Sequence, residues 1–291
     1  MRRSMLFIPG NTPNLLINGN CLGADAVIFD LEDAVSPAEK DSARILVRNT
    51  MKYLDFRGIE IIVRINSSDT DYWKKDLDEI MQYRPDLIML PKSATADDIL
   101  TVSSYMSETE KKYALADNTV KLMPLIETAM GVENAYSVAS ACERVAAIFL
   151  GAEDLTADLR CRRTKEGKEI EYARSRLVSA ARAAGVDVYD TPFTDVNDDE
   201  GIYLDAEHAR SLGFTGKASI SPRHVQVINE VFSPSQKDID YAYEVMDAIR
   251  QAKEQGRGAI ALHGKMIDAP IVARARQTIA MAEEMALRKE R

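Results

Sequence analysis

The chain has 291 residues, and its 46 acidic and 37 basic residues give a formal net charge of −9. Hydrophobic residues make up 46% and charged residues 29%, which argues against a disordered or fibrous protein. The acidic balance argues against a non-specific nucleic-acid binder, whose surface is usually basic. No apolar run reaches the roughly 18 residues of a membrane span, and Cys21, Cys142 and Cys161 have no CxxC spacing. We therefore expect a reduced, cytoplasmic protein that binds neither nucleic acid nor a membrane.

Short apolar runs recur along most of the chain. Most are rich in Ile, Val, Leu and Phe with little alternation, which is typical of strands buried on both faces of a parallel sheet. The last run is weak in composition, and we include it because its spacing fits the others. In chain order, the eight predicted strands are Ser4–Pro9, Ala26–Leu31, Glu60–Asn66, Leu87–Pro91, Lys121–Ile126, Ala146–Gly151, Val186–Thr191 and Gly216–Ser221.

Helical patterns lie between these runs. Ser36, Pro37 and Glu39 form the pattern of a helix start with a capping box. The stretch Ile170–Ala184 ends at Gly185, a residue type that commonly terminates helices. Alternating strands and helices predict right-handed βαβ units, and eight of them favour a (β/α)8 TIM barrel. A doubly wound open sheet stays possible, because periodicity alone does not show closure.

The pattern changes after the eighth run. We expect residues 1–232 to form the barrel and residues 233–291 to form a C-terminal extension that covers the barrel or reaches a neighbouring subunit. The extension is predicted as a helix, a hairpin with a tight glycine-containing turn, and a second helix. Its predicted elements are Lys237–Glu254, Gly258–Leu262, Lys265–Ile267 and Ala269–Lys289.

Charged residues follow several predicted strands, at the end of a barrel where active sites lie. Glu127 and Asp154 come from adjacent strands, and carboxylates without His or Cys suit Mg²⁺, which takes one or two of them beside water and substrate. Arg64 suits a substrate carboxylate, which it can bind through two parallel hydrogen bonds. A buried ion-pair network that closes the barrel mouth is the alternative. The residues at these strand ends are Asp30, Glu32, Asp33, Arg64, Lys92, Glu127 and Asp154.

Further basic residues are candidates for contacts with a ligand. Lys92 at a strand end is placed to form a Schiff base or to contact a phosphate or carboxylate. Arg2 and Arg3 precede the first strand and are candidates for contacts with coenzyme phosphates.

Longer motifs then occur in a fixed order: RRSMLFIPGN (2–11), GADAVIFDLEDAV (23–35), VRIN (63–66), LPK (90–92), PLIETAMGVENA (124–135), LGAEDLTADL (150–159), LGFTGKASISPRH (212–224) and GKMIDAP (264–270). Together they resemble the citrate lyase β-subunit family. That family lies within the HpcH/HpaI aldolase superfamily, in a group that includes malyl-CoA and citramalyl-CoA lyases.

The resemblance implies a (β/α)8 barrel that binds Mg²⁺ and is a carbon–carbon lyase. Its substrate would be citryl-CoA or a citryl-carrier thioester, cleaved into an acetyl thioester and oxaloacetate by retro-Claisen chemistry. Glu127 and Asp154 match the family's metal ligands, and Arg64 matches the arginine that holds the 2-oxo acid. Asp268 matches a catalytic acid/base that enters the site from a neighbouring subunit. The extension would then be a lid delivered within a homotrimer or hexamer.

The same resemblance implies supporting roles for the FDLED motif. Asp30, Glu32 and Asp33 match carboxylates that order metal-bound waters and the arginine. Lys92 lies in the LPK motif and would contact the substrate.

Departures from the usual family pattern leave the substrate open. The chain has MLPK where RLPK is usual, SISPRH for LINPRQ, and ALHGKM for SLNGKM. One alternative is a stand-alone citramalyl-CoA or malyl-CoA lyase, or a malate synthase-like condensation enzyme, acting on free CoA esters. Another is a non-catalytic subunit of a complex with citrate lyase α and γ subunits.

Overall fold

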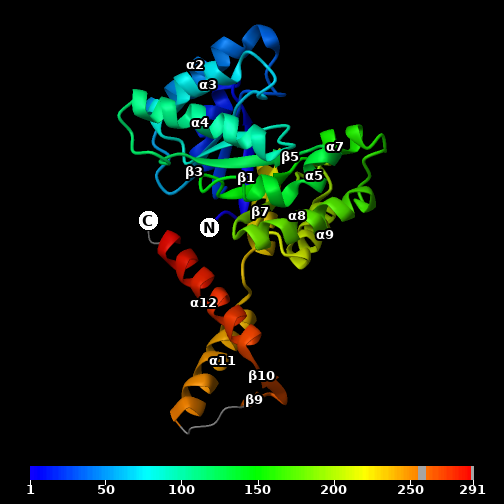
Figure 1. Cartoon of the computed structure of the whole chain (residues 1–291). Helices are drawn as coiled ribbons and strands as arrows, with labels where there is room; N and C mark the ends of the chain where they lie inside the picture. The colour runs from blue at the N-terminus through cyan, green and yellow to red at the C-terminus, as the bar shows by residue number, and fades with distance from the viewer. Residues whose placement is uncertain (255–259, 290–291) are drawn as a thin grey trace. The chain divides into compact units, whose positions relative to one another are not determined.

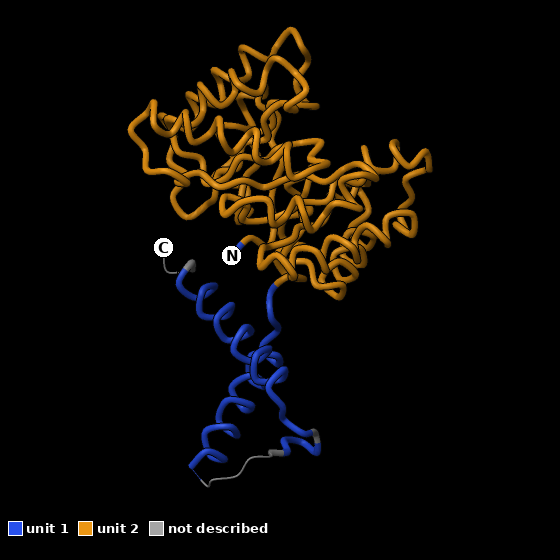
Figure 2. Tube along the Cα trace, in the orientation of Figure 1, with its two compact units in different colours: residues 1, 233–291 blue, residues 2–232 orange. Residues whose placement is uncertain are grey.

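A computed structural model describes residues 1–254 and 260–289. The described chain divides into two compact units (Figure 2). One comprises residues 2–232, and the other comprises Met1 with residues 233–291.

The unit 2–232, which is described without a gap, is a closed barrel of eight parallel strands in sequential order (Figure 1). Closure is direct, because Ser4 of the first strand is paired with Lys217 of the eighth. The (β/α)8 barrel prediction is confirmed, and the open sheet is excluded. The strands are β1 Ser4–Pro9, β2 Ala26–Asp30, β3 Glu60–Arg64, β4 Leu87–Leu90, β5 Lys121–Ile126, β6 Ala147–Leu150, β7 Asp187–Asp190 and β8 Gly216–Ser219.

Helices surround the strands, with α2, α3 and α4 on one side in Figure 1 and α8 and α9 on the opposite side. The α-helices of this unit are α1 Pro13–Asn18, α2 Lys40–Tyr53, α3 Trp73–Ile80, α4 Ala96–Lys112, α5 Ala129–Glu133, α6 Ala135–Ala139, α7 Ala152–Asp158, α8 Glu171–Ala184, α9 Asp199–Leu212 and α10 Pro222–Val231. Short 3-10 turns span Gly19–Cys21, Pro37–Glu39, Met81–Tyr83 and Lys168–Ile170.

The start of α2 differs from the prediction. Pro37–Glu39 is a 3-10 turn, and the α-helix begins only at Lys40. The Ser36 hydroxyl donates to the Glu39 carboxylate at 2.9 Å and makes no side-chain cap to the backbone. The two side chains of the predicted capping box thus bond to each other.

Both faces of the strands are buried, which explains the weak alternation of the apolar runs. Met5, Ile28, Ile62 and Met89 belong to the cluster that fills the barrel interior. The intervening strand residues, such as Val27, pack in the larger cluster between strands and helices. Such layered packing is typical of a filled (β/α)8 barrel.

The second unit contains α11 Gln236–Glu254, β9 Ile260–Leu262, β10 Lys265–Ile267 and α12 Ala269–Lys289. The strands form the predicted antiparallel hairpin, although positions 258 and 259 of the predicted first strand lie outside the described residues. His263 and Gly264 in its turn have φ values of 50° and 75°. Two positive φ values suit the tight turns that match strand twist.

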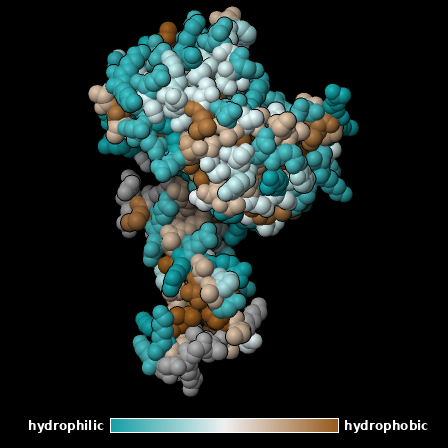
Figure 3. All heavy atoms as spheres, in the orientation of Figure 1, coloured by the Kyte–Doolittle hydropathy of each residue, from teal (hydrophilic) through white to brown (hydrophobic). Residues whose placement is uncertain are grey.

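The second unit has a small apolar core and exposed apolar side chains. Ala242, Val245, Ile267 and Ala275 form its buried core. Met266 is 69% exposed, and hydrophobic atoms gather on this unit in Figure 3. Within the described parts of the chain, no helix is both long and apolar enough to cross a membrane.

Candidate active site

A cavity of about 420 Å³ lies at the carboxyl ends of the barrel strands. One part of its lining is charged and another is apolar. Its lining residues are Phe7, Pro9, Asp30, Asp33, Ala34, Arg64, Leu125, Glu127, Phe149, Gly151, Ala152, Glu153, Asp154, Thr191, Pro192 and Ile220.

Arg64 is held rigidly at the mouth of the barrel. Asp30 and Arg64 are partners in the β2–β3 register, so their side chains emerge beside each other. Arg64 Nε and Nη2 donate to the two Asp30 carboxylate oxygens at 2.7 and 2.6 Å. The guanidinium lies 5.2 Å from the Phe7 ring centre. Its remaining nitrogen, Nη1, lies 3.1 Å from Glu32 and 3.5 Å from Asp33.

Glu32 is a buried carboxylate with an unusual environment. Its Oε2 atom is buried and accepts no hydrogen bond from the described residues. Burial raises the pKa of Glu32 to about 7, and the charges of Asp33 and Asp30 add to the increase while Arg64 and Lys92 oppose it. The charge of this oxygen is compensated by an ion pair, because Arg64 Nη1 lies 3.1 Å from the same Oε2 atom.

Glu127 follows β5 and points into the cavity. It is 3% exposed, and its Oε1 accepts a hydrogen bond from the Lys92 backbone N–H at 2.7 Å. Burial raises the pKa of Glu127 to about 8, and the nearby negative charges of Glu32 and Asp154 contribute. The carboxylate is therefore crowded by like charges.

Gly151 makes the room for this carboxylate. A Cβ atom at position 151 would lie 2.7 Å from both Cβ and Oε2 of Glu127. Such contacts are shorter than real Cβ contacts, so any side chain here would displace Glu127. Sequence reasoning missed Gly151, although the glycine of the LGAED motif was a visible signal.

Asp154 lies in α7 and lines the same cavity as Glu127. Within residues 1–254 and 260–289, no group of three or more His, Cys, Asp or Glu residues is arranged to hold a metal. A pair of carboxylates does fit Mg²⁺, because this ion keeps several waters and uses one or two carboxylates beside its substrate. Glu127 and Asp154, with the Gly151 cradle beside them, are the residues that fit the ion.

Lys92 contributes more through its backbone than through its ammonium group. Its backbone N–H holds Glu127. Its Nζ lies 3.9 Å from Glu32, and its side chain is 46% exposed. The structure brings Lys92 together with Asp30, Glu32, Asp33, Arg64, Glu127 and Asp154 around the barrel mouth.

Arg2 and Arg3 lie at the other end of the barrel. Arg2 forms ion pairs with Glu60, the first residue of β3, and with Asp187, the first residue of β7. The distance between Arg2 and Asp187 is 3.1 Å. Arg3 pairs with Asp25, just before β2, at 2.8 Å. The structure does not bring these arginines to the cavity, because carboxylates at the amino ends of the strands hold them there. Their predicted contact with coenzyme phosphates is unsupported by this placement.

Asp268 belongs to the unit 233–291. It lies between β10 and α12, and its Oδ1 accepts a hydrogen bond from the Ile271 backbone N–H at 3.1 Å. The side chain is exposed and starts the last helix. Its role as an acid/base stays a prediction.

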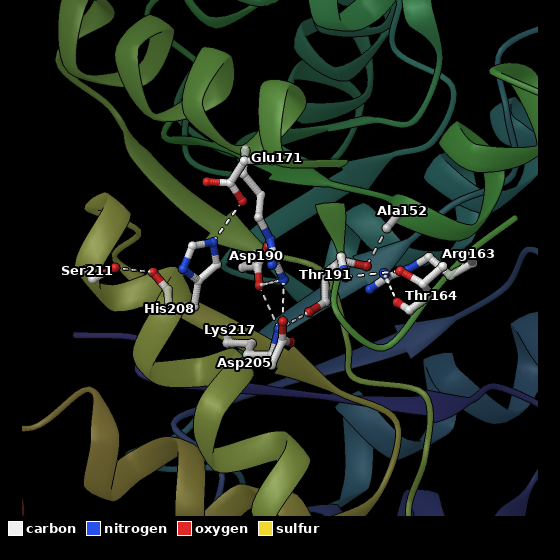
Figure 4. A network of polar contacts seen from close by, with 12 residues as sticks. Ala152, Arg163, Thr164, Glu171, Asp190, Thr191, Asp205, His208, Ser211 and Lys217 are labelled. Carbon is white, nitrogen blue, oxygen red and sulfur yellow. Dashed lines mark hydrogen bonds and ion pairs between the residues drawn. The ribbon is translucent and has the colours of Figure 1, made fainter. Parts of the chain in front are cut away.

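A buried ion network connects α8, β7 and β8 with the start of α7 (Figure 4). Arg174 and Lys217 both contact Asp190, at 2.8 and 2.6 Å. Lys217 Nζ also donates to the Thr191 carbonyl at 2.6 Å, and Thr191 Oγ1 accepts from the Ala152 N–H at 3.2 Å. The network thus reaches the first residue of α7, the helix that carries Asp154.

Fold and site together define an enzyme of the (β/α)8-barrel class, with acidic groups and one arginine around a cavity at the carboxyl ends of the strands. The HpcH/HpaI aldolase/citrate lyase family model matches residues 3–222. The chain belongs to this family and is a carbon–carbon lyase by class, which confirms the resemblance seen in its motifs.

Individual relatives cover nearly the whole chain. Over 282 residues the chain is 42% identical to citrate lyase subunit beta of Leuconostoc mesenteroides subsp. cremoris, covering 97% of this chain and 93% of the relative. It is 34% identical to a (3S)-malyl-CoA thioesterase of Cereibacter sphaeroides, and the match covers 98% of this chain and 95% of the relative. The chain also resembles the structure of protein CitE from Mycobacterium tuberculosis in complex with magnesium, acetoacetate and coenzyme A. The TM-score is 0.79 at 30% identity, and the match covers 97% of this chain and 98% of that chain.

Proposed function

We propose that the chain is a Mg²⁺-dependent lyase that cleaves citryl-CoA or a citryl-carrier thioester into an acetyl thioester and oxaloacetate. The observation that carries the proposal is the placement of Glu127, Asp154 and Arg64 around one cavity. The 42% identity to a citrate lyase subunit beta supports the citryl substrate. The magnesium and coenzyme A in the Mycobacterium tuberculosis complex support the ion and the thioester.

Glu127 and Asp154 would hold the ion. When bound, Mg²⁺ polarises the substrate oxygens and stabilises charge on the forming 2-oxo acid. Gly151 and the Lys92 N–H keep the Glu127 carboxylate in place before the ion arrives. This leaves the second Glu127 oxygen and Asp154 for coordination.

Arg64 would bind a carboxylate of the 2-oxo acid. Asp30 occupies two of its nitrogens and fixes the plane of the guanidinium. Nη1 lies on the side of Glu32 and Asp33. A fixed cation stabilises the negative charge of the product with little reorganisation.

Asp268 would complete the reaction. The hydroxyl would lose its proton to the Asp268 carboxylate, the bond between the hydroxyl-bearing carbon and the thioester α-carbon breaks, and the electron pair of that bond forms the thioester enolate. Asp268 then gives a proton to the enolate carbon, as an acid/base positioned by a neighbouring subunit. The exposed apolar groups of the extension suit packing against a second subunit of a homotrimer or hexamer.

Two further parts of the proposal concern partners and compartment. A carrier-bound substrate would make the citrate lyase α and γ subunits partners of this chain. Cys21, Cys142 and Cys161 form no disulfide, which fits a reducing compartment, and we place the protein in the cytoplasm.

A second candidate is citramalyl-CoA or malyl-CoA cleavage. Ile220 lines the cavity and lies between Ser219 and Ser221, two positions at which the chain departs from the usual LINPRQ pattern. The 34% identity to a (3S)-malyl-CoA thioesterase also supports this candidate.

One assay panel tests both candidates. The purified chain is incubated with Mg²⁺ and citryl-CoA, citramalyl-CoA or malyl-CoA, and the 2-oxo acid is measured with a coupled dehydrogenase. We expect the highest kcat/KM with citryl-CoA, loss of activity on chelation, and recovery on adding Mg²⁺. Activity that survives chelation, together with a borohydride-trapped adduct on Lys92, would instead establish Schiff-base chemistry. Inactivity with all three free esters but activity with a citryl carrier would show a requirement for the carrier.

A further inference from the structure

The backbone of Lys92 has a left-handed conformation. Its φ is 53°, one of six positive φ values among the non-glycine residues that the structure describes. This region is sterically unfavourable for residues with a Cβ atom. Such a conformation persists only where the surrounding structure enforces it, and it is often found at functional sites.

The neighbours of Lys92 enforce this conformation. On its carboxyl side, the Ser93 N–H donates to the Leu125 carbonyl at 3.1 Å, and the Ser93 hydroxyl donates to the Leu90 carbonyl at 2.8 Å. The turn is also packed from outside, because a Cβ atom at Gly131 of α5 would lie 2.7 Å from the Ser93 carbonyl oxygen. The turn after β4 is therefore fixed by β5 and α5.

The result of this geometry is a hydrogen bond to Glu127. The Lys92 N–H points at Glu127 Oε1 at 2.7 Å. In the described part of the chain, this is the hydrogen bond that holds the Glu127 side chain. The Lys92 ammonium group is 3.9 Å from Glu32 and half exposed, so its ion pair is weak.

We propose that Lys92 is a positioning residue whose left-handed backbone, and not its ammonium group, orients Glu127 for cation binding. This inference rests on the proposed role of Glu127 as a metal ligand. A partner that orients a ligand typically contributes about 10- to 100-fold to metal affinity.

Three substitutions separate backbone from side chain. Lys92→Ala removes the ammonium group but keeps an unbranched Cβ atom. Alanine therefore meets the same steric cost at positive φ as lysine does. Lys92→Gly removes it and also tolerates the left-handed region without strain. Lys92→Val disfavours positive φ because its side chain is β-branched. Each variant keeps a backbone N–H.

The probe is Mn²⁺ alone, titrated into the purified full chain by calorimetry. We expect the Mn²⁺ affinities of Lys92→Ala and Lys92→Gly to lie within about twofold of the affinity of the original chain. A twofold difference in affinity is close to thermal energy. We expect Lys92→Val to bind about 10- to 100-fold more weakly, because the N–H no longer points at Glu127.

Arg84→Val is the matched control. Arg84 also has a left-handed backbone, with φ of 54°, and lies in the connection that enters the same strand from its amino end. We expect this variant to lower the melting temperature as Lys92→Val does but to leave Mn²⁺ affinity unchanged.

The outcomes distinguish the inference from the proposed function. The proposed backbone role is wrong if Lys92→Val binds Mn²⁺ as tightly as the original chain, or if Lys92→Ala loses as much Mn²⁺ affinity as Lys92→Val does. Neither result contradicts the proposed metal site. If the original chain binds no Mn²⁺, the metal site itself is wrong. Should Lys92→Val fail to fold, amide exchange at Lys92 is compared between the original chain and Glu127→Ala. Faster exchange in Glu127→Ala supports the hydrogen bond, and an unchanged rate overturns it.

Discussion

Gly151 shows how a missing side chain shapes the site. The Glu127 carboxylate occupies the space that a side chain at position 151 would fill. In Gly151→Ala, we expect Glu127 to shift and Mn²⁺ affinity to fall about tenfold. Overpacking of the cavity wall is expected to cost about 1–3 kcal/mol of unfolding free energy. Calorimetric titration and urea unfolding measure the two effects.

The control for this variant is Gly58→Ala. Gly58 has φ of 87° and no atom within 4 Å of its would-be Cβ, so alanine is strained there without touching the site. We expect it to destabilise the chain while Mn²⁺ affinity stays unchanged. Unaltered affinity in Gly151→Ala would mean that Glu127 does not need this space to bind a cation.

Arg64 provides a second prediction at the scale of one residue. Lysine keeps the charge but loses the fork that binds Asp30 and that, in our proposal, also holds a substrate carboxylate. We expect Arg64→Lys to weaken oxaloacetate binding about 10- to 100-fold, the loss of about 1.5–3 kcal/mol for a charged hydrogen bond. Mn²⁺ affinity should change little. Fluorescence titration with oxaloacetate measures the first effect, and full retention of binding would contradict the proposed contact.

At the scale of elements, the strands were predictable because buried parallel strands carry an apolar run of defined length. All eight were found, within two residues at each end. The residues after these runs also gave most of the cavity, because the barrel gathers the carboxyl ends of its strands. The start of α2 was mispredicted because Ser36 and Glu39 bond to each other rather than to the backbone.

Two features of the site had no local signal. The conformation of Lys92 depends on contacts from β5 and α5, since lysine has no preference for positive φ. The network of Arg174, Asp190, Asp205 and Lys217 joins residues from α8, β7, α9 and β8. Sequence spacing cannot reveal these pairings, because helix packing and barrel closure create them.

Asp205 in this network leads to a pH prediction. Its carboxylate lies 2.7 Å from Arg174 and 2.6 Å from Lys217. Burial acts to raise the pKa of Asp205, but the two cations outweigh it and lower the pKa to about 2. Because the folded-state pKa lies below the unfolded value of about 3.9, this stabilisation is present above pH 4. It is lost as the pH falls towards 2.

Comparison with Asp205→Asn isolates this effect. At pH 7 we expect the substitution to cost about 3–5 kcal/mol, because it leaves two buried cations with Asp190 as their one remaining carboxylate in the network. The difference in unfolding free energy between the two proteins should shrink as the pH falls from 4 to 2. Urea unfolding at several pH values measures it, and a difference that does not change with pH would contradict the lowered pKa.

At the scale of the whole molecule, the barrel and the extension have different physical characters. The barrel buries a continuous apolar core and contains the whole cavity lining. The extension has a small core of four buried residues among those described, with exposed apolar groups such as Met266. An isolated unit with so small a core needs packing against other protein surface. The motif that contains Asp268 lies in this unit.

A subunit-mixing experiment tests whether Asp268 acts across subunits. We expect Asp268→Asn to abolish turnover while Mn²⁺ and oxaloacetate binding persist, since its barrel is unchanged. We expect Glu127→Gln to be inactive because its barrel lacks one of the two proposed metal ligands.

If a site combines one barrel with a neighbour's Asp268, equal mixing of the two inactive variants restores about a quarter of the sites in a cyclic oligomer. Half of the barrels are intact, and half of these receive an intact Asp268. Activity is measured after co-refolding, with gel filtration and native mass spectrometry to verify mixed oligomers. Mixed oligomers without recovered activity would show that Asp268 serves the barrel of its own chain.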